Sequence, residues 1–232
     1  MAELHKIVAT LKDALETQPR QVRNSDRMPP AAVATPASVA QRQQLASQFA
    51  RELESVAGRF LGTLTPAEAI AKMVDVAHER NARLVAIGEG VEVDSSAIET
   101  ALFTAGVSVM HPSPIADAQT RIALRERLAR CDLGIAEAHF AIASTGTLGV
   151  FSSARRSSSL TLLPPASLIL VHIDRVVPDL AAALARIDRN TIARDRLTLI
   201  TGPSRTADIE KRIVLGVHGP KSLDVIVVWP HD

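Results

Sequence analysis

Helical and strand-like segments alternate between residues 65 and 131, and this alternation limits the fold more than any other feature. Thr65 and Pro66 begin the first helix, and Glu68 follows the threonine at the spacing of a capping box. Strands joined by helices run parallel, because a parallel pair needs a long crossover connection. The pattern predicts helices up to residue 80, over 95–106 and over 122–131, with buried strands at 83–90 and 107–111.

Beyond Cys131 the apolar segments follow one another more closely. Most gaps between these segments are too short for a helical crossover, so part of the sheet is expected to be antiparallel or mixed. The fold class predicted is therefore α/β, with a mixed, partly parallel sheet flanked by helices. The segments are strands at 132–138, 147–153, 159–163, 167–173, 197–201 and 224–229, and a helix at 178–187.

The N-terminal region has a different character. Residues 3–17 carry apolar side chains at helical spacing, and four prolines follow between residues 18 and 38. A second helix is predicted from about Ser38 to Ala57. We therefore expect an N-terminal helix and proline-rich arm over residues 1–35, and an α/β domain over residues 36–232.

Composition argues against several classes of function. Lys and Arg number 26 against 25 Asp and Glu, and aromatic residues make up 3%, so neither a basic groove nor a stacking surface for nucleic acid is indicated. The single cysteine, Cys131, cannot build an iron–sulfur cluster alone, and the seven histidines show no metal-binding spacing. We expect no bound metal. With neither a signal peptide nor a membrane-spanning stretch, a cytoplasmic protein is expected.

Hydroxyl side chains gather beside a glycine in the segment AIASTGTLGVFSS, residues 141–153. Thr145, Gly146 and Thr147, with the turn's backbone N–H groups, are a candidate cradle for a phosphate or carboxylate, and Arg155 and Arg156 are near enough in sequence to add positive charge. The alternative is structural, since hydroxyl-rich turns end strands in many α/β proteins.

The segment GPSRTADIEKRIVLGVHGP, residues 202–220, is a second candidate. Ser204 or Thr206 is expected to cap a short helical turn, and Arg205 follows a strand, where open α/β sheets bind ligands. His218, between glycines, is a candidate acid, base or hydrogen-bond donor. In the structural alternative, Arg205 pairs with a nearby acid of the loop and His218 bonds to a carbonyl.

Glu137 and His139 form a weaker acid/base candidate, because their i,i+2 spacing places them on one face only where the backbone is extended. Cys131 is expected to be a buried small apolar side chain rather than a nucleophile.

The combination of CDLGIAEAHFAIASTGTLGV, SLTLLPP and GPSRTADIEKRIVLGVHGP resembles the LUD-domain family, from about the second helix to the C-terminus. The resemblance implies an α/β domain similar to the NagB/RpiA/CoA-transferase-like superfamily of sugar isomerases and CoA transferases. It also implies a part in the oxidation of L-lactate to pyruvate beside partner proteins that carry iron–sulfur clusters, while this chain holds no cofactor itself.

Two departures from the family pattern bear on chemistry. The family usually has Glu or Asp before Thr-Gly, where this chain has Ser144, so a catalytic carboxylate is missing there. After the double proline the family commonly has a histidine, where this chain has Ser167 nearby and His172 further on.

Three functions follow from these observations. The first is a cluster-free subunit of a lactate-oxidising system that binds a small anion or a partner through the 145–147 turn and the 202–220 loops. The second is a free-standing enzyme acting on a phosphorylated sugar, a folate or a CoA ester, with His218 and Arg205 as acid/base and anion clamp. The third is a scaffold without a ligand pocket.

Overall fold

The computed structural model describes residues 38–91, 93–153, 156–187, 196–207, 213–215 and 219–229. The predicted N-terminal helix and proline-rich arm lie outside these residues. The helices are α2 (Val39–Ser55), α3 (Pro66–Glu79), α4 (Ser95–Thr104), α5 (Ala118–Leu128) and α6 (Leu180–Ala185), with 3₁₀ turns η1 (Ser158–Thr161) and η2 (Ile173–Arg175). The strands are β1 (Arg59–Leu64), β2 (Leu84–Ile87), β3 (Ser108–Met110), β4 (Leu133–Glu137), β5 (Phe140–Ile142), β6 (Thr147–Ser152), β7 (Ala166–His172), β8 (Val176–Val177), β9 (Arg196–Ile200), β10 (Arg205–Ala207), β11 (Ile213–Leu215) and β12 (Ser222–Val228).

A six-stranded sheet organises the chain, in the order β1-β12-β7-β4-β2-β3, and all its neighbouring pairs are parallel. The helices predicted from capping signals are present. Thr65 accepts a hydrogen bond from the N–H of Glu68, whose carboxylate accepts one from the N–H of Thr65, so the predicted capping box is confirmed. The predicted partly parallel α/β fold is confirmed as well.

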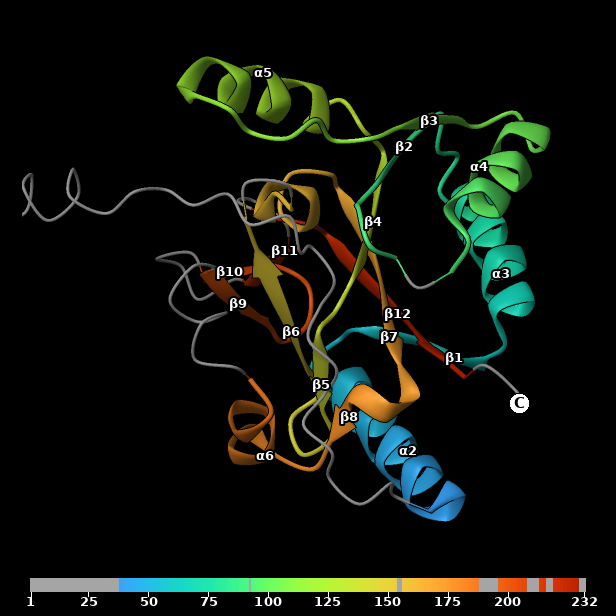
Figure 1. The fold of residues 1–232 in the computed structure, drawn as a ribbon, viewed down its shortest axis with the longest axis vertical. Coiled ribbons are helices and arrows are strands. Elements are labelled where there is room, and N and C mark those ends of the chain that lie inside the picture. The colour runs from blue at the N-terminus through green and yellow to red at the C-terminus, as the bar shows by residue number, and fades with distance from the viewer. Residues whose placement is uncertain are drawn as a thin grey trace, which may run out of the picture. The chain divides into compact units, whose positions relative to one another are not determined.

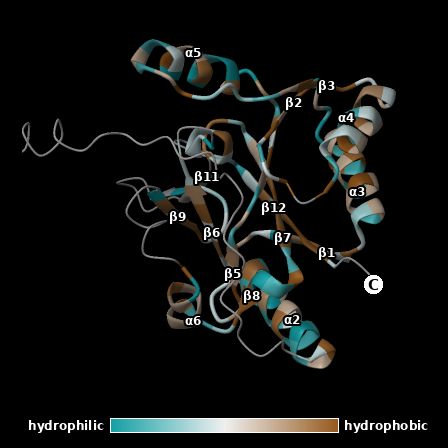
Figure 2. Cartoon of the chain, viewed as in Figure 1, coloured by the Kyte–Doolittle hydropathy of each residue, from teal (hydrophilic) through white to brown (hydrophobic). Residues whose placement is uncertain are grey.

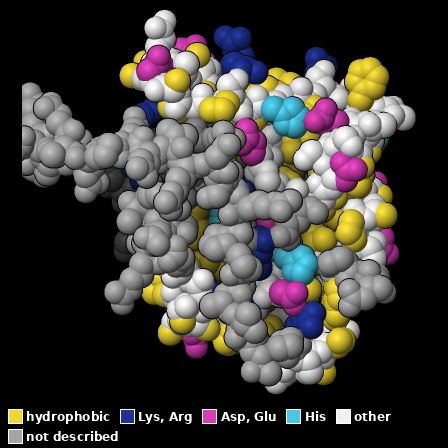
Figure 3. Space-filling view, viewed as in Figure 1, with side chains coloured by type: hydrophobic (Ala, Val, Ile, Leu, Met, Phe, Trp, Pro, Cys, Tyr) yellow, Lys and Arg dark blue, Asp and Glu magenta, His cyan; other side chains and the backbone are white. Residues whose placement is uncertain are grey.

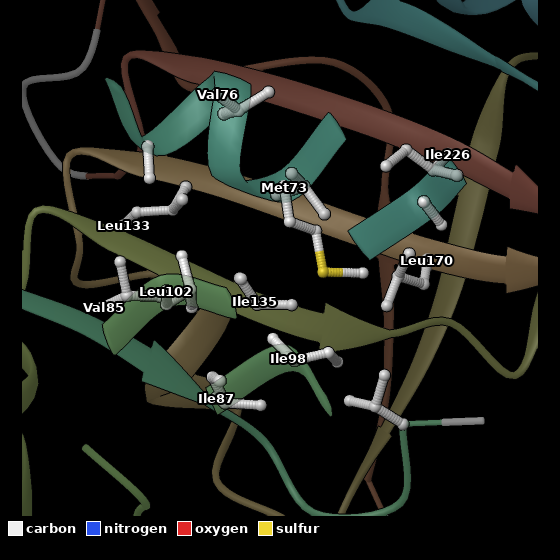
Figure 4. Packing of buried hydrophobic residues seen from close by; sticks show 14 of the residues in the cluster. Met73, Val76, Val85, Ile87, Ile98, Leu102, Leu133, Ile135, Leu170 and Ile226 are labelled. Carbon is white, nitrogen blue, oxygen red and sulfur yellow. The ribbon is translucent and has the colours of Figure 1, made fainter. Parts of the chain in front are cut away.

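Two layers cover the sheet. Alternate strand residues point to opposite faces, so one set of apolar side chains packs against α3 and α4 and the other against α2 and a smaller sheet. Figure 4 shows Met73 and Val76 of α3, with Ile98 of α4, over strand residues that include Ile135. The strands of the parallel sheet are mostly hydrophobic, and the helices combine hydrophilic and hydrophobic residues (Figure 2). Figure 1 shows α3 and α4 together on one side of the parallel sheet.

The closely spaced strands after β4 form separate, smaller sheets. A four-stranded sheet has the order β8-β5-β6-β9, with β5-β6 and β6-β9 antiparallel, and β10 pairs with β11 as an antiparallel hairpin. One prediction is wrong here, and a second is wrong in part. The 3₁₀ turn η1 takes the place of residues 159–161 of the expected strand 159–163. Residues 205–207 form β10, so no helical turn follows Ser204, while a turn after Thr206 would lie mostly outside the described residues.

The strand order contains a point at which the chain reverses direction across the sheet. From β2 the chain passes through α4 to β3 on one side, then returns through α5 to β4 on the other side of β2, and continues outward to β7. Open α/β sheets bind ligands in the crevice outside the carboxyl ends of the strands at such a switch point. The carboxyl ends of β2 and β4 therefore mark the place to look for a site.

Candidate functional site

A crevice occupies the switch point between the carboxyl ends of β2 and β4. The described part of the crevice wall contains three ionisable side chains besides the exposed Glu89. They are Glu137, His139 and Arg156. The remaining wall is small or apolar. The described lining residues are Gly88, Glu89, Pro112, Ala136, Glu137, His139, Val150, Phe151, Arg156, Ser157, Leu160 and Thr161.

His139 is positioned by the β5-β6 hairpin. Its Nδ1 accepts a hydrogen bond of 3.1 Å from the backbone N–H of Phe151, and its backbone N–H donates to the carbonyl of Gly149. The imidazole therefore accepts a hydrogen bond from a backbone N–H of β6, next to the last residue pair of the β5-β6 ladder. The ring also meets the ring of Phe151 edge to face, with the centroids 5.0 Å apart. His139 is thus fixed by two contacts.

The other ring nitrogen, Nε2, lies 2.9 Å from Nη1 of Arg156. The backbone N–H of Phe151 and the guanidinium of Arg156 are both donors, whereas a neutral imidazole has a single acceptor nitrogen, so one of the two contacts sets a donor against a donor. With the ring proton on Nε2, the mismatched contact is the one with Arg156, and a hydrogen-bond acceptor beside both groups would relieve it.

Arg156 reaches this position over the turn that follows β2. Gly90 has φ of +78°, which favours glycine, and a Cβ on it would lie 2.2 Å from Nη2 of Arg156 and would displace the guanidinium from its present position. On the other side, the backbone N–H of Arg156 donates to the hydroxyl of Ser153, whose own N–H donates to the carbonyl of Arg156. The GEG sequence after β2 thus accommodates an arginine.

Glu137, the last residue of β4, is held by an ion pair. Its Oε1 accepts from Nη1 of Arg175 in η2, and both side chains are mostly buried, at 10% and 17% exposure. Glu137 and His139 line the same crevice, as the i,i+2 spacing requires of an extended backbone. The positive charge of Arg175 balances the carboxylate, and Arg156 places a second positive charge beside His139.

Burial and the positive charges of Arg156 and Arg175 lower the pKa of His139 to about 3. At neutral pH the imidazole is therefore uncharged. An anion bound next to it would favour the protonated form and raise this pKa. The crevice is thus suited to an acceptor with negative charge, such as a carboxylate oxygen.

The lowered pKa makes the folded protein sensitive to acid, and His139→Asn should reduce that sensitivity. The ordinary pKa is about 6.5, so between pH 6.5 and 3 the unfolded chain takes up a proton that the native state does not. The free energy of unfolding consequently falls by about 2 kcal/mol between pH 7 and pH 5. The asparagine Oδ1 still accepts from Phe151, and urea unfolding of both proteins at the two pH values measures the difference. An equal fall in both proteins would contradict this assignment.

The hydroxyl-rich turn of residues 144–147 lies away from the crevice lining and is bonded within the fold. The N–H groups of Ser144 and Thr145 donate to carbonyls of Pro178 and Ile142, and the hydroxyl of Thr147 lies 2.8 Å from those of Thr145 and Thr201. Gly146 has φ of +62° and packs on α2, where a Cβ would lie 2.3 Å from a backbone nitrogen. Anion binding by Thr145, Gly146 and Thr147 stays a prediction.

The second predicted site, in residues 202–220, is only partly described. Ser204 donates its backbone N–H to the carbonyl of Pro220, Arg205 is exposed at the start of β10, and Thr206 belongs to the same strand. His218 lies outside the described residues. Neither Ser204 nor Arg205 lines the switch-point crevice, and ligand binding by these residues remains a prediction.

From the sequence His139 is only a weak candidate, and no pattern points to Arg175. Glu137 and Arg175 are 38 residues apart, and His139 and Arg156 are 17 apart, so no short spacing reveals either contact. Within the described residues, no group of three or more His, Cys, Asp or Glu side chains is arranged to hold a metal ion.

Fold and crevice together define a class: an α/β protein with a parallel sheet, a switch-point crevice, and paired arginine and histidine donors. The LUD-domain family model matches residues 46–228, and the chain belongs to that family. A solved structure, a DUF162 family protein from Deinococcus radiodurans, is 20% identical, covers 81% of this chain and 98% of its own, and has a TM-score of 0.57. That likeness supports the fold.

Curated relatives are more similar in sequence over a shorter length. The protein called lactate utilization protein C of Geobacillus thermodenitrificans is 34% identical over 103 residues, which cover 43% of each chain. The protein of the same name from Exiguobacterium is 34% identical over 114 residues, 47% of this chain and 49% of the relative. The YkgG protein of Escherichia coli is 33% identical over 100 residues. The chain thus spans less than half the length of these curated relatives.

Proposed function

We propose that this protein serves lactate utilisation as a subunit that binds a small carboxylate in the switch-point crevice and carries no iron–sulfur cluster. The names of the similar proteins from Geobacillus and Exiguobacterium support the process. The donors and charge of the crevice lining support the ligand class, and its volume of about 30 Å³ restricts the ligand to a very small molecule. In this proposal a 2-hydroxy or 2-keto acid places its carboxylate on Arg156.

The observation that carries the proposal is the 2.9 Å contact between Nε2 of His139 and Nη1 of Arg156, which brings two donors together in the tautomer that has its proton on Nε2. A carboxylate oxygen accepts from both, and a guanidinium matches a carboxylate with two parallel hydrogen bonds. The apolar side chains of Ala136 and Val150 in the same wall suit the methyl group of lactate or pyruvate. Charge and hydrogen bonding therefore favour the same ligand class.

The electron-transfer chemistry is assigned to partners. The chain has one cysteine, Cys131, which is buried with its Sγ directed at the carbonyl of Arg127, and burial raises the pKa of its thiol. One buried thiol supplies no cluster ligand set. We therefore propose iron–sulfur partner proteins and a cytoplasmic location. No helix within the described residues is long and apolar enough to cross a membrane.

The surface in view fits association with proteins rather than polyanions. Acidic, basic and apolar side chains are interspersed on the face drawn in Figure 3, with no single large basic area among the coloured residues. A field of one sign is what steers polyanions to a protein.

A second candidate, an enzyme of the sugar-isomerase and CoA-transferase type, is favoured by one observation: Glu137 and His139 line one crevice. Both groups are restrained, however, since the carboxylate is paired with Arg175 and the imidazole is a weak base. Turnover of sugar phosphates or CoA esters by the purified chain would favour this candidate.

Calorimetric titration of the purified protein tests the carboxylate proposal. L-Lactate, pyruvate, acetate, inorganic phosphate and a sugar phosphate are titrated separately at pH 7. The proposal expects lactate or pyruvate to bind more tightly than acetate or phosphate. Equal affinity for all the anions, or binding of the sugar phosphate alone, would contradict it.

The exposed Arg205 gives a separate test of the 202–206 loop. Arg205→Ala should cost about 1 kcal/mol or less of stability, as surface substitutions usually do. If this loop binds a ligand or partner, growth on lactate by a strain carrying only the variant should nevertheless fail. Growth assays paired with thermal melting decide the matter. Normal growth, or lost growth with a large drop in melting temperature, would contradict a binding role for Arg205.

A further inference from the structure

Arginine side chains are concentrated on α5 and the residues that follow it. Four arginines fall within residues 121–130, against one acidic residue, Glu126. All four are exposed, and none forms an ion pair with an acidic side chain of the described residues. We call them the α5 arginine surface, and they are Arg121, Arg125, Arg127 and Arg130.

The two acidic residues that flank this segment are used by the fold. The carboxylate of Asp117 caps α5 by accepting from the N–H of Thr120. The carboxylate of Asp132 accepts from the backbone N–H groups of Arg83 and Leu84. The described part of the chain therefore supplies no counter-charge to the α5 arginine surface.

The stability of α5 accounts for only part of this charge. Cations near the C-terminus of a helix interact favourably with its dipole, which applies to Arg125 and Arg127 in the last turn. Arg121 is the fourth residue of α5, near the N-terminus, where the dipole disfavours a cation. The next residue, Ile122, is 58% exposed. Arginine beside exposed apolar surface is typical of interfaces between proteins.

α5 lies beside the switch-point crevice and apart from α3 and α4 (Figure 1). Leu124 and Leu128 of α5 belong to one cluster with Leu160 of η1, and Leu160 is also part of the crevice wall. Pro112, another wall residue, lies in the connection from β3 to α5. A protein that docks on α5 is therefore next to a molecule bound in the crevice.

We propose that the α5 arginine surface docks the iron–sulfur partner through an acidic face of that protein. This inference rests on the proposed function, and it adds the element of this chain that the partner contacts and the charge that the partner presents. Complementary charge speeds the encounter of two proteins and fixes their orientation. Nucleic acid is a poorer occupant, because α5 has no aromatic side chain on which bases could stack and Glu126 interrupts the positive charge.

A variant that combines Arg121→Gln, Arg127→Gln and Arg130→Gln tests the proposal. It is expected to fold, since all three residues are exposed. The tagged full chain is recovered from its native host grown on lactate, and the iron-containing proteins that remain bound are identified and purified. Their rate of association with the chain is then measured at low and at high salt. At low salt the variant should associate at least about tenfold more slowly than the unchanged chain, and high salt should reduce the difference.

The matched control removes the same number of positive charges outside α5, at exposed residues. Its changes are Arg51→Gln, Arg196→Gln and Lys221→Gln. The control should associate at nearly the rate of the unchanged chain. Equal slowing of both variants, or of neither, would overturn docking on α5 while leaving the iron–sulfur partnership in place. Recovery of no iron-containing protein would contradict the partnership and the inference with it. RNA or phosphatidylglycerol vesicles bound by the unchanged chain but not by the α5 variant would give the surface to another occupant and overturn the proposal.

Discussion

Replacing Arg59 and Arg80 together with methionine is expected to lower the free energy of unfolding by about 3–5 kcal/mol at pH 7. The reason is Asp224, which is 1% exposed in the third position of β12. Its Oδ1 accepts from Nε of Arg59 at 2.7 Å, and its Oδ2 accepts from Nη2 and Nε of Arg80. Without these donors a buried carboxylate has no compensating charge.

The same physics predicts a recovery. A triple variant that adds Asp224→Leu should regain most of the loss, because removing a whole buried ionic group costs far less than breaking it. Arg42→Met is the control for an exposed pair, since its partner Asp174 has a side chain that is 56% exposed, and it should cost less than about 1 kcal/mol. Chemical unfolding measures all four proteins. A double variant as stable as the unchanged protein would contradict the assignment.

Arg156→Gln is expected to weaken binding of the carboxylate ligand at least about thirtyfold while leaving the melting temperature nearly unchanged. Truncating one partner of a hydrogen-bonded charge pair at a binding site typically costs 2–5 kcal/mol, and 1.4 kcal/mol is tenfold in affinity. Arg156→Lys should be intermediate, because lysine keeps the charge without the planar pair of donors. Calorimetric titration with pyruvate measures the affinities.

Arg125→Gln serves as the control for total charge. Arg125 is exposed on α5 and does not line the crevice, so its loss should leave pyruvate affinity unchanged. Equal weakening in both variants would mean that the net charge, and not the contact at His139, governs binding. Normal binding of pyruvate by the Arg156→Gln protein would contradict carboxylate binding in the crevice.

The fold was predictable where local signals agree with one another. The Thr65 capping box, the helix over residues 95–106 and the buried strand before Gly88 each combine a cap or turn with a clear apolar period, and all are present. The strand β1 was not predicted. It is an edge strand, partly exposed along most of its length, and its pairing is interrupted by a register shift at Gly62, so it lacks a clean alternation.

The segment of residues 158–163 shows how packing overrides pattern. Its alternating leucines suggested a strand, but Leu160 inserts beside Leu124 and Leu128 of α5, while Leu162 remains 41% exposed. The close approach of Gly134 fixes this geometry, since a Cβ there would lie 2.3 Å from the carbonyl oxygen of Leu160. The spacing of apolar residues within this segment does not reveal such a contact between β4 and η1.

The sequence predicts the individual residues of the candidate site but not their proximity. Arg156, His139 and Glu137 are each candidates from the sequence, yet their contacts depend on the β5-β6 hairpin and on the strand order around β2. The contacts that join them span 17 and 38 residues. The hydroxyl-rich turn and the 202–206 loop are stronger signals in the sequence because their residues are adjacent.

A crystal structure of the protein soaked with pyruvate would show whether the crevice is the carboxylate site. We expect the carboxylate in the switch-point crevice, with one oxygen within hydrogen-bond distance of both Nε2 of His139 and the guanidinium of Arg156, and Glu137 still paired with Arg175. Pyruvate bound at the 145–147 turn or beside Arg205, with the contact between His139 and Arg156 unchanged, would contradict it.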